Sequence, residues 1–243
     1  MILSTQEVFE VLQKGYPVAV VRAGDGENIV LNGFADHVNF AAVMKRQLGF
    51  YPPIDHCQQI IDNLKEAYKG ADIIGIPMHK NLDALNHHWQ GVSDNVNQYA
   101  VTDKRCSIDV CYDMLYEGLL TEWLKEKRVI NYISCRTLPF ERRWGTSQVN
   151  HFKIAPECKF TTYQGEPHYP DQFNRIHRWM DKCAVEGNPC LVGAGVIGKL
   201  YVNWFRDRGG VAIDIGAVFD LWAGKATRGP KRGLDAVDET YRL

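Results

Sequence analysis

Two kinds of apolar pattern alternate along the chain. Short continuous apolar runs are typical of buried strands, and apolar residues spaced three or four apart are typical of amphipathic helices. The runs predict strands at residues 17–22, 71–78, 128–134, 151–155, 189–193 and 211–216. The helical spacing predicts helices at residues 5–14, 108–127, 170–186 and 196–208, and one through 60–68 that stops at Gly70. This alternation predicts one doubly wound α/β domain over residues 1–243, with a mostly parallel sheet and helices on both faces.

The first helix also carries a start signal. Ser4 and Glu7 have the S-x-x-E spacing of a capping box, directly before the apolar positions Val8, Val11 and Leu12. We therefore expect this helix to begin at Thr5.

Composition narrows the class of protein. Apolar residues make up 45% of the 243 residues and charged residues 23%, values that exclude a disordered, collagen-like or coiled-coil chain. With 28 Lys and Arg against 29 Asp and Glu, the net charge of −1 provides no overall field for coating nucleic acid.

Cysteine usage and the N-terminal segment predict a location. The seven cysteines are odd in number and form no CxxC, and the segment MILSTQEVFEVLQ lacks a signal-peptide pattern. We expect reduced thiols in a cytoplasmic protein. The Cys and His spacings match no zinc finger, and no stretch approaches the 18 apolar residues of a membrane span.

The first chemical motif, RAGDGE, directly follows the first predicted strand, where ligands bind in doubly wound sheets. In an extended segment, Asp25 and Glu27 would point to the same side and could face one ligand. Gly24 and Gly26 would let the backbone approach that ligand closely. Paired carboxylates suit Mg²⁺ or Mn²⁺ bound together with substrate phosphates. The alternative is a plain Asp-Gly turn.

The second motif is a GxGxxG at Gly193, Gly195 and Gly198, between a predicted strand and a predicted helix. With Asp214 at the end of the next strand, it approaches the fingerprint of a dinucleotide site. Only 45 residues follow Gly198, too few for the second half of a dinucleotide domain. A glycine-rich turn in the sheet, or the border of a mononucleotide site, remain the other interpretations.

The third motif is KATRGPKR at residues 225–232, within a basic C-terminal tail predicted at 217–243. Arg228 and Lys231 beside glycine suit phosphate contact, although charge runs are usually solvated. Weaker candidates are Arg136, Arg142 and Arg143 after a strand, and the loop residues Glu166 and His168 as a lid or acid/base site.

Together, these ordered segments resemble the GT-D glycosyltransferases, which are bacterial enzymes typified by a glucosyltransferase that extends glycans on serine-rich adhesins. The matching pieces are Val20–Glu27, Ile73–Pro77, Leu191–Gly216 and, more weakly, 154–156. The resemblance implies a GT-D-like, Rossmann-related fold, a nucleotide-sugar donor, usually a UDP-sugar, and a divalent ion. It also implies that Asp25 and Glu27 bind metal and donor. Two departures are Ala23, where the family usually has a large apolar residue, and Ala217, where it often has histidine.

The expected chemistry assigns further roles. Glycosyl transfer develops negative charge on the departing diphosphate, which Arg22, Arg228 or Lys231 would stabilise together with the metal. If the reaction inverts, Asp214 or Asp220 would serve as base on the acceptor hydroxyl. If it retains, no protein base is required.

The leading hypothesis is therefore a metal-dependent glycosyltransferase. A glycan, a glycoprotein or, as a minority option, nucleic acid would be its acceptor. The alternatives are an NAD(P)-dependent oxidoreductase that uses the GxGxxG turn, and a noncatalytic nucleotide- or glycan-binding module.

Overall fold

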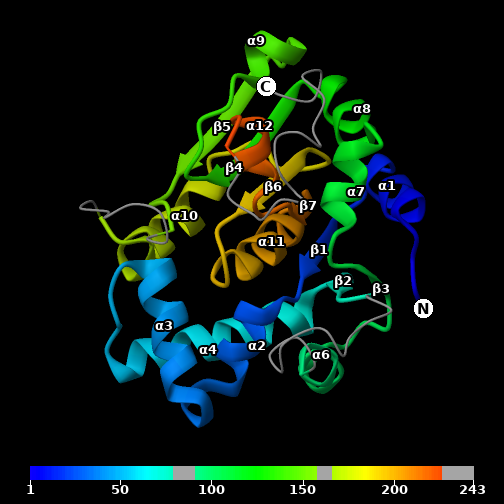
Figure 1. The fold of residues 1–243 in the computed structure, drawn as a ribbon. Coiled ribbons are helices and arrows are strands. Elements are labelled where there is room, and N and C mark those ends of the chain that lie inside the picture. The colour runs from blue at the N-terminus through cyan, green and yellow to red at the C-terminus, as the bar shows by residue number, and fades with distance from the viewer. Residues whose placement is uncertain (79–90, 158–165, 226–243) are drawn as a thin grey trace.

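The computed structural model describes residues 1–78, 91–157 and 166–225, which contain a seven-stranded sheet with the order β3-β2-β1-β7-β6-β4-β5 (Figure 1). Every neighbouring pair of these strands is parallel. The strands are β1 Val18–Arg22, β2 Ile73–Ile76, β3 Arg105–Ser107, β4 Val129–Ser134, β5 Gln148–Lys153, β6 Pro189–Gly193 and β7 Val211–Asp214. The predicted doubly wound α/β fold is thus confirmed, and the mostly parallel sheet is parallel throughout these strands.

Helices cover both faces of the sheet (Figure 1). One face carries α2 Asp25–Asn32, α3 His37–Leu48, α4 Ile54–Gly70, α6 Val92–Tyr99, α10 Phe173–Met180 and α11 Gly198–Asp207. The other carries α1 Thr5–Gln13, α7 Val110–Tyr116, α8 Leu119–Lys125, α9 Phe140–Trp144 and α12 Val218–Trp222. Short 3₁₀ and π segments lie at Gly33–Asp36 and His168–Gln172. Among the described residues, we find no helix both long and apolar enough to cross a bilayer.

Strand β1 shows why the buried strands read as continuous apolar runs. Val18 and Val20 pack into the cluster beneath α1 and α7, whereas Ala19 and Val21 pack into the cluster beneath α4 and α11. Because side chains alternate across a strand and both faces are covered, the four buried positions 18–21 are all apolar, and the one charged residue, Arg22, stands at the carboxyl end.

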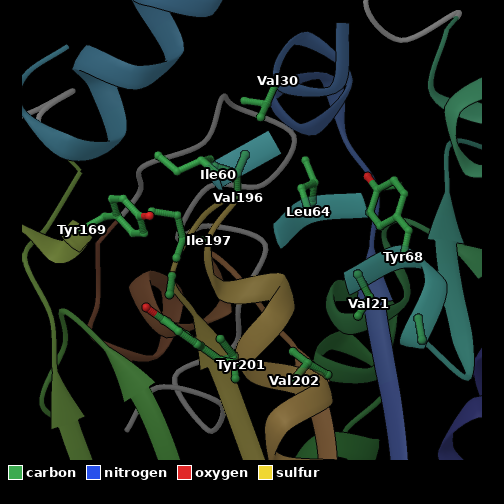
Figure 2. Packing of buried hydrophobic residues seen from close by; sticks show 14 of the residues in the cluster. Val21, Val30, Ile60, Leu64, Tyr68, Tyr169, Val196, Ile197, Tyr201 and Val202 are labelled. Atoms are coloured by element: carbon green, nitrogen blue, oxygen red, sulfur yellow. The ribbon is translucent and has the colours of Figure 1, made fainter. Parts of the chain in front are cut away.

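On the face that carries α4 and α11, these two helices build most of the core. Figure 2 shows Ile60, Leu64 and Tyr68 of α4 in one apolar cluster with Val202 of α11 and Val21 of β1. This contact fixes α11, and hence the glycine turn that precedes it, against the sheet.

Several of the predicted helix and strand boundaries differ from those in the structure. The helix predicted over 108–127 is two helices, because Gly118 adopts the left-handed conformation with φ 78° at the start of α8. The helix predicted to reach residue 186 ends at Met180, and the strand predicted to reach 216 ends at Asp214. The capping box at Ser4 and Glu7 is confirmed.

The strand order places a crevice at the centre of the sheet. From β1 the chain moves outward to β2 and β3, and it later returns on the other side so that β7 pairs with β1. After β4 the chain steps outward to the edge strand β5, whereas after β6 it steps inward to β7, so the direction of winding reverses between β4 and β6. Ligands bind at the carboxyl ends of strands at such a reversal.

Candidate active site

A cavity of about 300 Å³ lies at this reversal point. Its lining includes the carboxyl ends of β1, β4, β6 and β7 and the segments that follow them. The predicted site residues Arg22, Asp25, Glu27, Asp214 and Asp220 all line it. So do Gly24, Gly26, Gly193 and Gly195.

The RAGDGE motif does not continue as an extended segment, and this part of the sequence interpretation is wrong. Helix α2 begins at Asp25, so Asp25 and Glu27 are its first and third residues and project about 200° apart around the helix axis. Glu27 Oε2 accepts a hydrogen bond from the Gly24 N–H at 2.9 Å, as in a capping box. Asp25 Oδ1 accepts one from the Gly26 N–H at 2.8 Å. The two carboxylates border one cavity but occupy different environments.

A buried lysine that the sequence analysis missed joins two of the predicted acids. Lys199, in the first turn of α11, is 4% exposed, and its Nζ lies 3.2 Å from Glu27 Oε1. The same ammonium donates a hydrogen bond to Asp214 Oδ2. The sequence does contain a signal for this residue, because Lys199 directly follows the last glycine of GAGVIG. The glycine spacing by itself does not indicate it.

Asp214 is the centre of this charge cluster. Its Oδ1 accepts hydrogen bonds from the Gly216 N–H at 3.1 Å and from Arg22 Nη2 at 3.4 Å. Burial raises the pKa of the Asp214 carboxyl, but attraction to Arg22 and Lys199 outweighs burial and leaves that pKa below its usual value. A carboxylate whose pKa lies below that of an ordinary aspartate is a weak general base near neutral pH.

The glycine turn is filled by protein groups. The Val196 N–H donates to Gln47 Oε1 at 2.9 Å, and a Cβ on Gly195, whose φ is +60°, would lie 2.3 Å from that oxygen. A Cβ on Gly193 would lie 2.5 Å from Phe219 Cδ2. These glycines allow close packing, and the amide and Asp214 that a dinucleotide site would use are already engaged.

We expect Gly193→Ala to lower the free energy of unfolding by about 1–3 kcal/mol, since the added methyl group overpacks the contact with Phe219 and the Gly216 carbonyl. Gly26→Ala is the control, because its Cβ would meet only ordinary contacts at 3.6 Å or more within a helix. Urea unfolding of both variants measures the difference, and equal stabilities would contradict this packing role.

The weaker candidates divide between the cavity and the surface. Arg136 lines the cavity, and its Nε lies 2.6 Å from Asp220 Oδ1. Arg142 and Arg143 are exposed on α9 and do not line it. Glu166 forms an ion pair with Arg175 of α10, with both side chains more than a third exposed.

His168 lies on the cavity wall, as its predicted place in an acid/base loop allows. It is 4% exposed, and its Nε2 shares a hydrogen bond of 2.9 Å with the Tyr201 hydroxyl. Burial lowers the pKa of His168 to about 4, so the imidazole is neutral at pH 7. A neutral imidazole with this pKa is a hydrogen-bonding group rather than a strong base.

Arg46 is a second functional candidate that the sequence analysis missed. It reaches the cavity from α3, where a Cβ on Gly26 would lie 3.6 Å from its Nη2. Its Nε is buried with no hydrogen-bond partner, and no acid in residues 1–78, 91–157 or 166–225 forms an ion pair with it. It is thus a cation on the cavity lining beside Gly26.

The predicted basic tail is described only in part. Residues 218–222 form the buried helix α12, whose Trp222 belongs to the core. Arg228 and Lys231 lie outside the described residues.

Comparison with known families resolves the class of this fold. A family model described as "GT-D fold-like domain" (GT-D-like) matches residues 4–222. The chain belongs to the GT-D-like family. The resemblance read from the sequence is confirmed. No curated protein matches the chain.

Solved structures place the GT-D-like chain among glycosyltransferase folds. One is described as "A New Glycosyltransferase (DUF1792) from Streptococcus sanguinis"; it is 15% identical, with a TM-score of 0.60 over 88% of this chain and 80% of that chain. Another, "The highly conserved domain of unknown function 1792 has a distinct glycosyltransferase fold", is 16% identical, with a TM-score of 0.56 over 88% and 77%. At these identities the likeness establishes the fold.

Of the two carboxylates predicted to bind a divalent ion in this GT-D-like cavity, only Asp25 has an oxygen that the described residues leave available for it. Within the described ranges, no group of three or more His, Cys, Asp or Glu side chains is placed to hold a metal. Both Glu27 oxygens are engaged, whereas Asp25 Oδ2 has no hydrogen-bond partner among the described residues. One available carboxylate oxygen suits an ion that takes its remaining ligands from substrate phosphates and water.

Proposed function

We propose that this GT-D-like protein is a glycosyltransferase that moves a sugar from a nucleoside-diphosphate sugar, a UDP-sugar in the first instance, to a hydroxyl acceptor. The observation that carries the proposal is the cavity at the sheet reversal, where Arg46, Lys199 and Arg22 gather around the start of α2. Cations at that position suit the diphosphate of a nucleotide sugar.

The transfer balances without a further reactant. The acceptor hydroxyl oxygen forms a bond to the anomeric carbon, and the bond from that carbon to the β-phosphate oxygen breaks. The bonding pair leaves with the nucleoside diphosphate, and the hydroxyl proton passes to a base or to water. The products are a glycoside, a nucleoside diphosphate and a proton.

The residues divide this work between binding and charge stabilisation. Arg46 and Lys199 would hold the diphosphate, and Arg22 would keep Asp214 in place beside Lys199. Asp25 would hold Mn²⁺ or Mg²⁺ jointly with donor phosphate oxygens, and the ion would withdraw charge from the leaving diphosphate. Glu27 is the other predicted metal ligand, and in the structure its carboxylate is paired with Lys199.

A base for an inverting reaction would have to come from the cavity wall. Between the two predicted acids, Asp220 fits better than Asp214, because Asp214 is held by Arg22, Lys199 and the Gly216 N–H. Asp220 pairs with Arg136, so it would need that arginine to move before it accepted a proton.

We propose a glycan or glycoprotein hydroxyl as the acceptor.

The test is a binding panel followed by turnover. UDP, GDP, UDP-glucose, UDP-GlcNAc and NADH are added with and without Mn²⁺, and thermal unfolding is followed. A ligand at 100 times its Kd adds about 2.7 kcal/mol to stability, which raises the Tm by a few degrees. We expect a nucleoside diphosphate to raise the Tm more with Mn²⁺, and donor turnover to release that diphosphate.

Asp25→Asn is expected to fold normally and to lose the Mn²⁺-dependent part of the rise in Tm that a nucleoside diphosphate causes. Asp55→Asn is the matched control, because Asp55 is also in the first turn of a helix but is exposed outside the cavity. A shift with NADH alone would overturn the proposal in favour of an oxidoreductase. Binding without turnover of any donor would leave a nucleotide-binding module instead.

A further inference from the structure

The ammonium of Lys199 has a hydrogen-bond donor to spare. A lysine ammonium carries three N–H donors, and two of these face Asp214 and Glu27. In residues 1–78, 91–157 and 166–225 the ammonium has no third acceptor, and Lys199 is part of the cavity lining. The third donor is therefore available to a ligand in the cavity.

Burying the positive charge of Lys199 at this position destabilises the folded protein, so a stabilising role does not explain it. It lies in the first turn of α11, where the helix dipole disfavours a positive charge, and it is almost fully buried. Two carboxylates hold it there, and each is fixed in turn: Glu27 by the Gly24 N–H, and Asp214 by the Gly216 N–H. Such an arrangement holds a cation rigidly at the cavity surface.

We propose that Lys199 binds the donor diphosphate and stabilises its growing charge as the sugar leaves, and that Glu27 is a positioning residue that orients Lys199 rather than a metal ligand. This inference rests on the proposed glycosyl transfer. A phosphate oxygen would accept the third N–H of Lys199 while Glu27 and Asp214 keep the ammonium in place. The metal would then depend on Asp25 and the donor alone.

The experiment measures diphosphate preference. Isothermal titration compares the nucleoside diphosphate that the wild type binds best with the corresponding nucleoside, for the wild type, Lys199→Met and the control Lys69→Met. Lys69 is exposed on α4 and also pairs with a glutamate, Glu66. We expect Lys199→Met to weaken the diphosphate about 10- to 100-fold and to leave nucleoside affinity within about twofold. Lys69→Met should change neither.

Turnover kinetics distinguish a role of Lys199 in charge stabilisation from a merely structural role. Since the charge on the diphosphate grows in the transition state, Lys199→Met should lower kcat more than it raises KM. The double variant Lys199→Met/Glu27→Gln removes one charge of each sign and covers the case in which the single variant fails to fold. It should show the same loss of diphosphate preference.

Glu27→Gln separates positioning from metal binding. Its amide oxygen can still accept the Gly24 N–H, so the start of α2 is preserved. We expect the Mn²⁺-dependent part of diphosphate binding to persist in Glu27→Gln and to vanish in Asp25→Asn.

Three results would overturn this inference. They are unchanged diphosphate affinity in Lys199→Met, equal losses for diphosphate and nucleoside, and loss of the Mn²⁺ effect in Glu27→Gln. With the wild type still binding and transferring, these outcomes would leave the glycosyltransferase proposal standing. A wild type that binds no nucleoside diphosphate would overturn both.

Discussion

Replacing Asp214 with asparagine is expected to lower the free energy of unfolding by about 3–5 kcal/mol. Asp214 is 3% exposed, and it is the shared partner of Arg22 and Lys199. Asparagine keeps the shape of the side chain but removes its charge. Lys199 would then keep only Glu27, and Arg22 would lose the acid with which it pairs among the described residues. A buried charge that loses its partner is strongly destabilising. Urea or guanidinium unfolding at pH 7 measures the effect.

Two controls make this expectation specific. Asp62→Asn removes a carboxylate that is 55% exposed and pairs with Lys65, and it should change stability by no more than about 1 kcal/mol. The double variant Asp214→Asn/Lys199→Met should lose less than the sum of its single variants, because it removes an anion and its cation together. Additive losses would mean that the two residues are not coupled.

The role of Asp214 follows from the same balance of charges. The sequence assigned it to the ribose of a dinucleotide or to the base of an inverting transfer. Its two cationic partners and its lowered pKa favour a third role, in which the carboxylate holds Arg22 and Lys199 at the cavity. Its position at the end of a strand was predicted correctly, but position alone does not distinguish a reacting group from one that fixes its neighbours.

The sheet could be predicted because its signal is local. Strands such as β1 and β6 are covered on both faces, so each is an unbroken apolar run that needs no knowledge of its partners. The glycine turn and the RAGDGE motif were likewise placed at strand ends from the sequence alone. Their gathering in one cavity follows from the parallel order of the sheet.

The parts that escaped prediction depend on contacts between distant segments. Nothing near Glu27 in the sequence indicates that its partner is Lys199, more than 170 residues away, nor that Gln47 fills the turn at Val196. The extended interpretation of RAGDGE failed because both glycines favour a turn, while the Glu27 carboxylate caps a helix that starts at Asp25. Arg46 was missed because the sequence did not predict α3.

Acidification should destabilise the protein through His168 well before the carboxylates protonate. The folded imidazole has a pKa of about 4 because of its burial, against 6.5 when exposed. Between these values the unfolded chain binds a proton that the folded chain does not, so stability falls as the pH falls. The contribution is fully present above about pH 6.5 and amounts to about 3 kcal/mol once lost.

The measurement is the free energy of unfolding between pH 7 and pH 5, where we expect the wild type to lose about 2 kcal/mol through His168. His151 adds a loss of the same sign, since burial also lowers its pKa. His168→Gln retains an amide that can hydrogen-bond the Tyr201 hydroxyl but cannot take up a proton in this range. Its stability should therefore fall less over the same interval. Parallel curves for the two proteins would show that His168 is protonated equally in the folded and unfolded states, and that the cavity wall is wetter than its burial indicates.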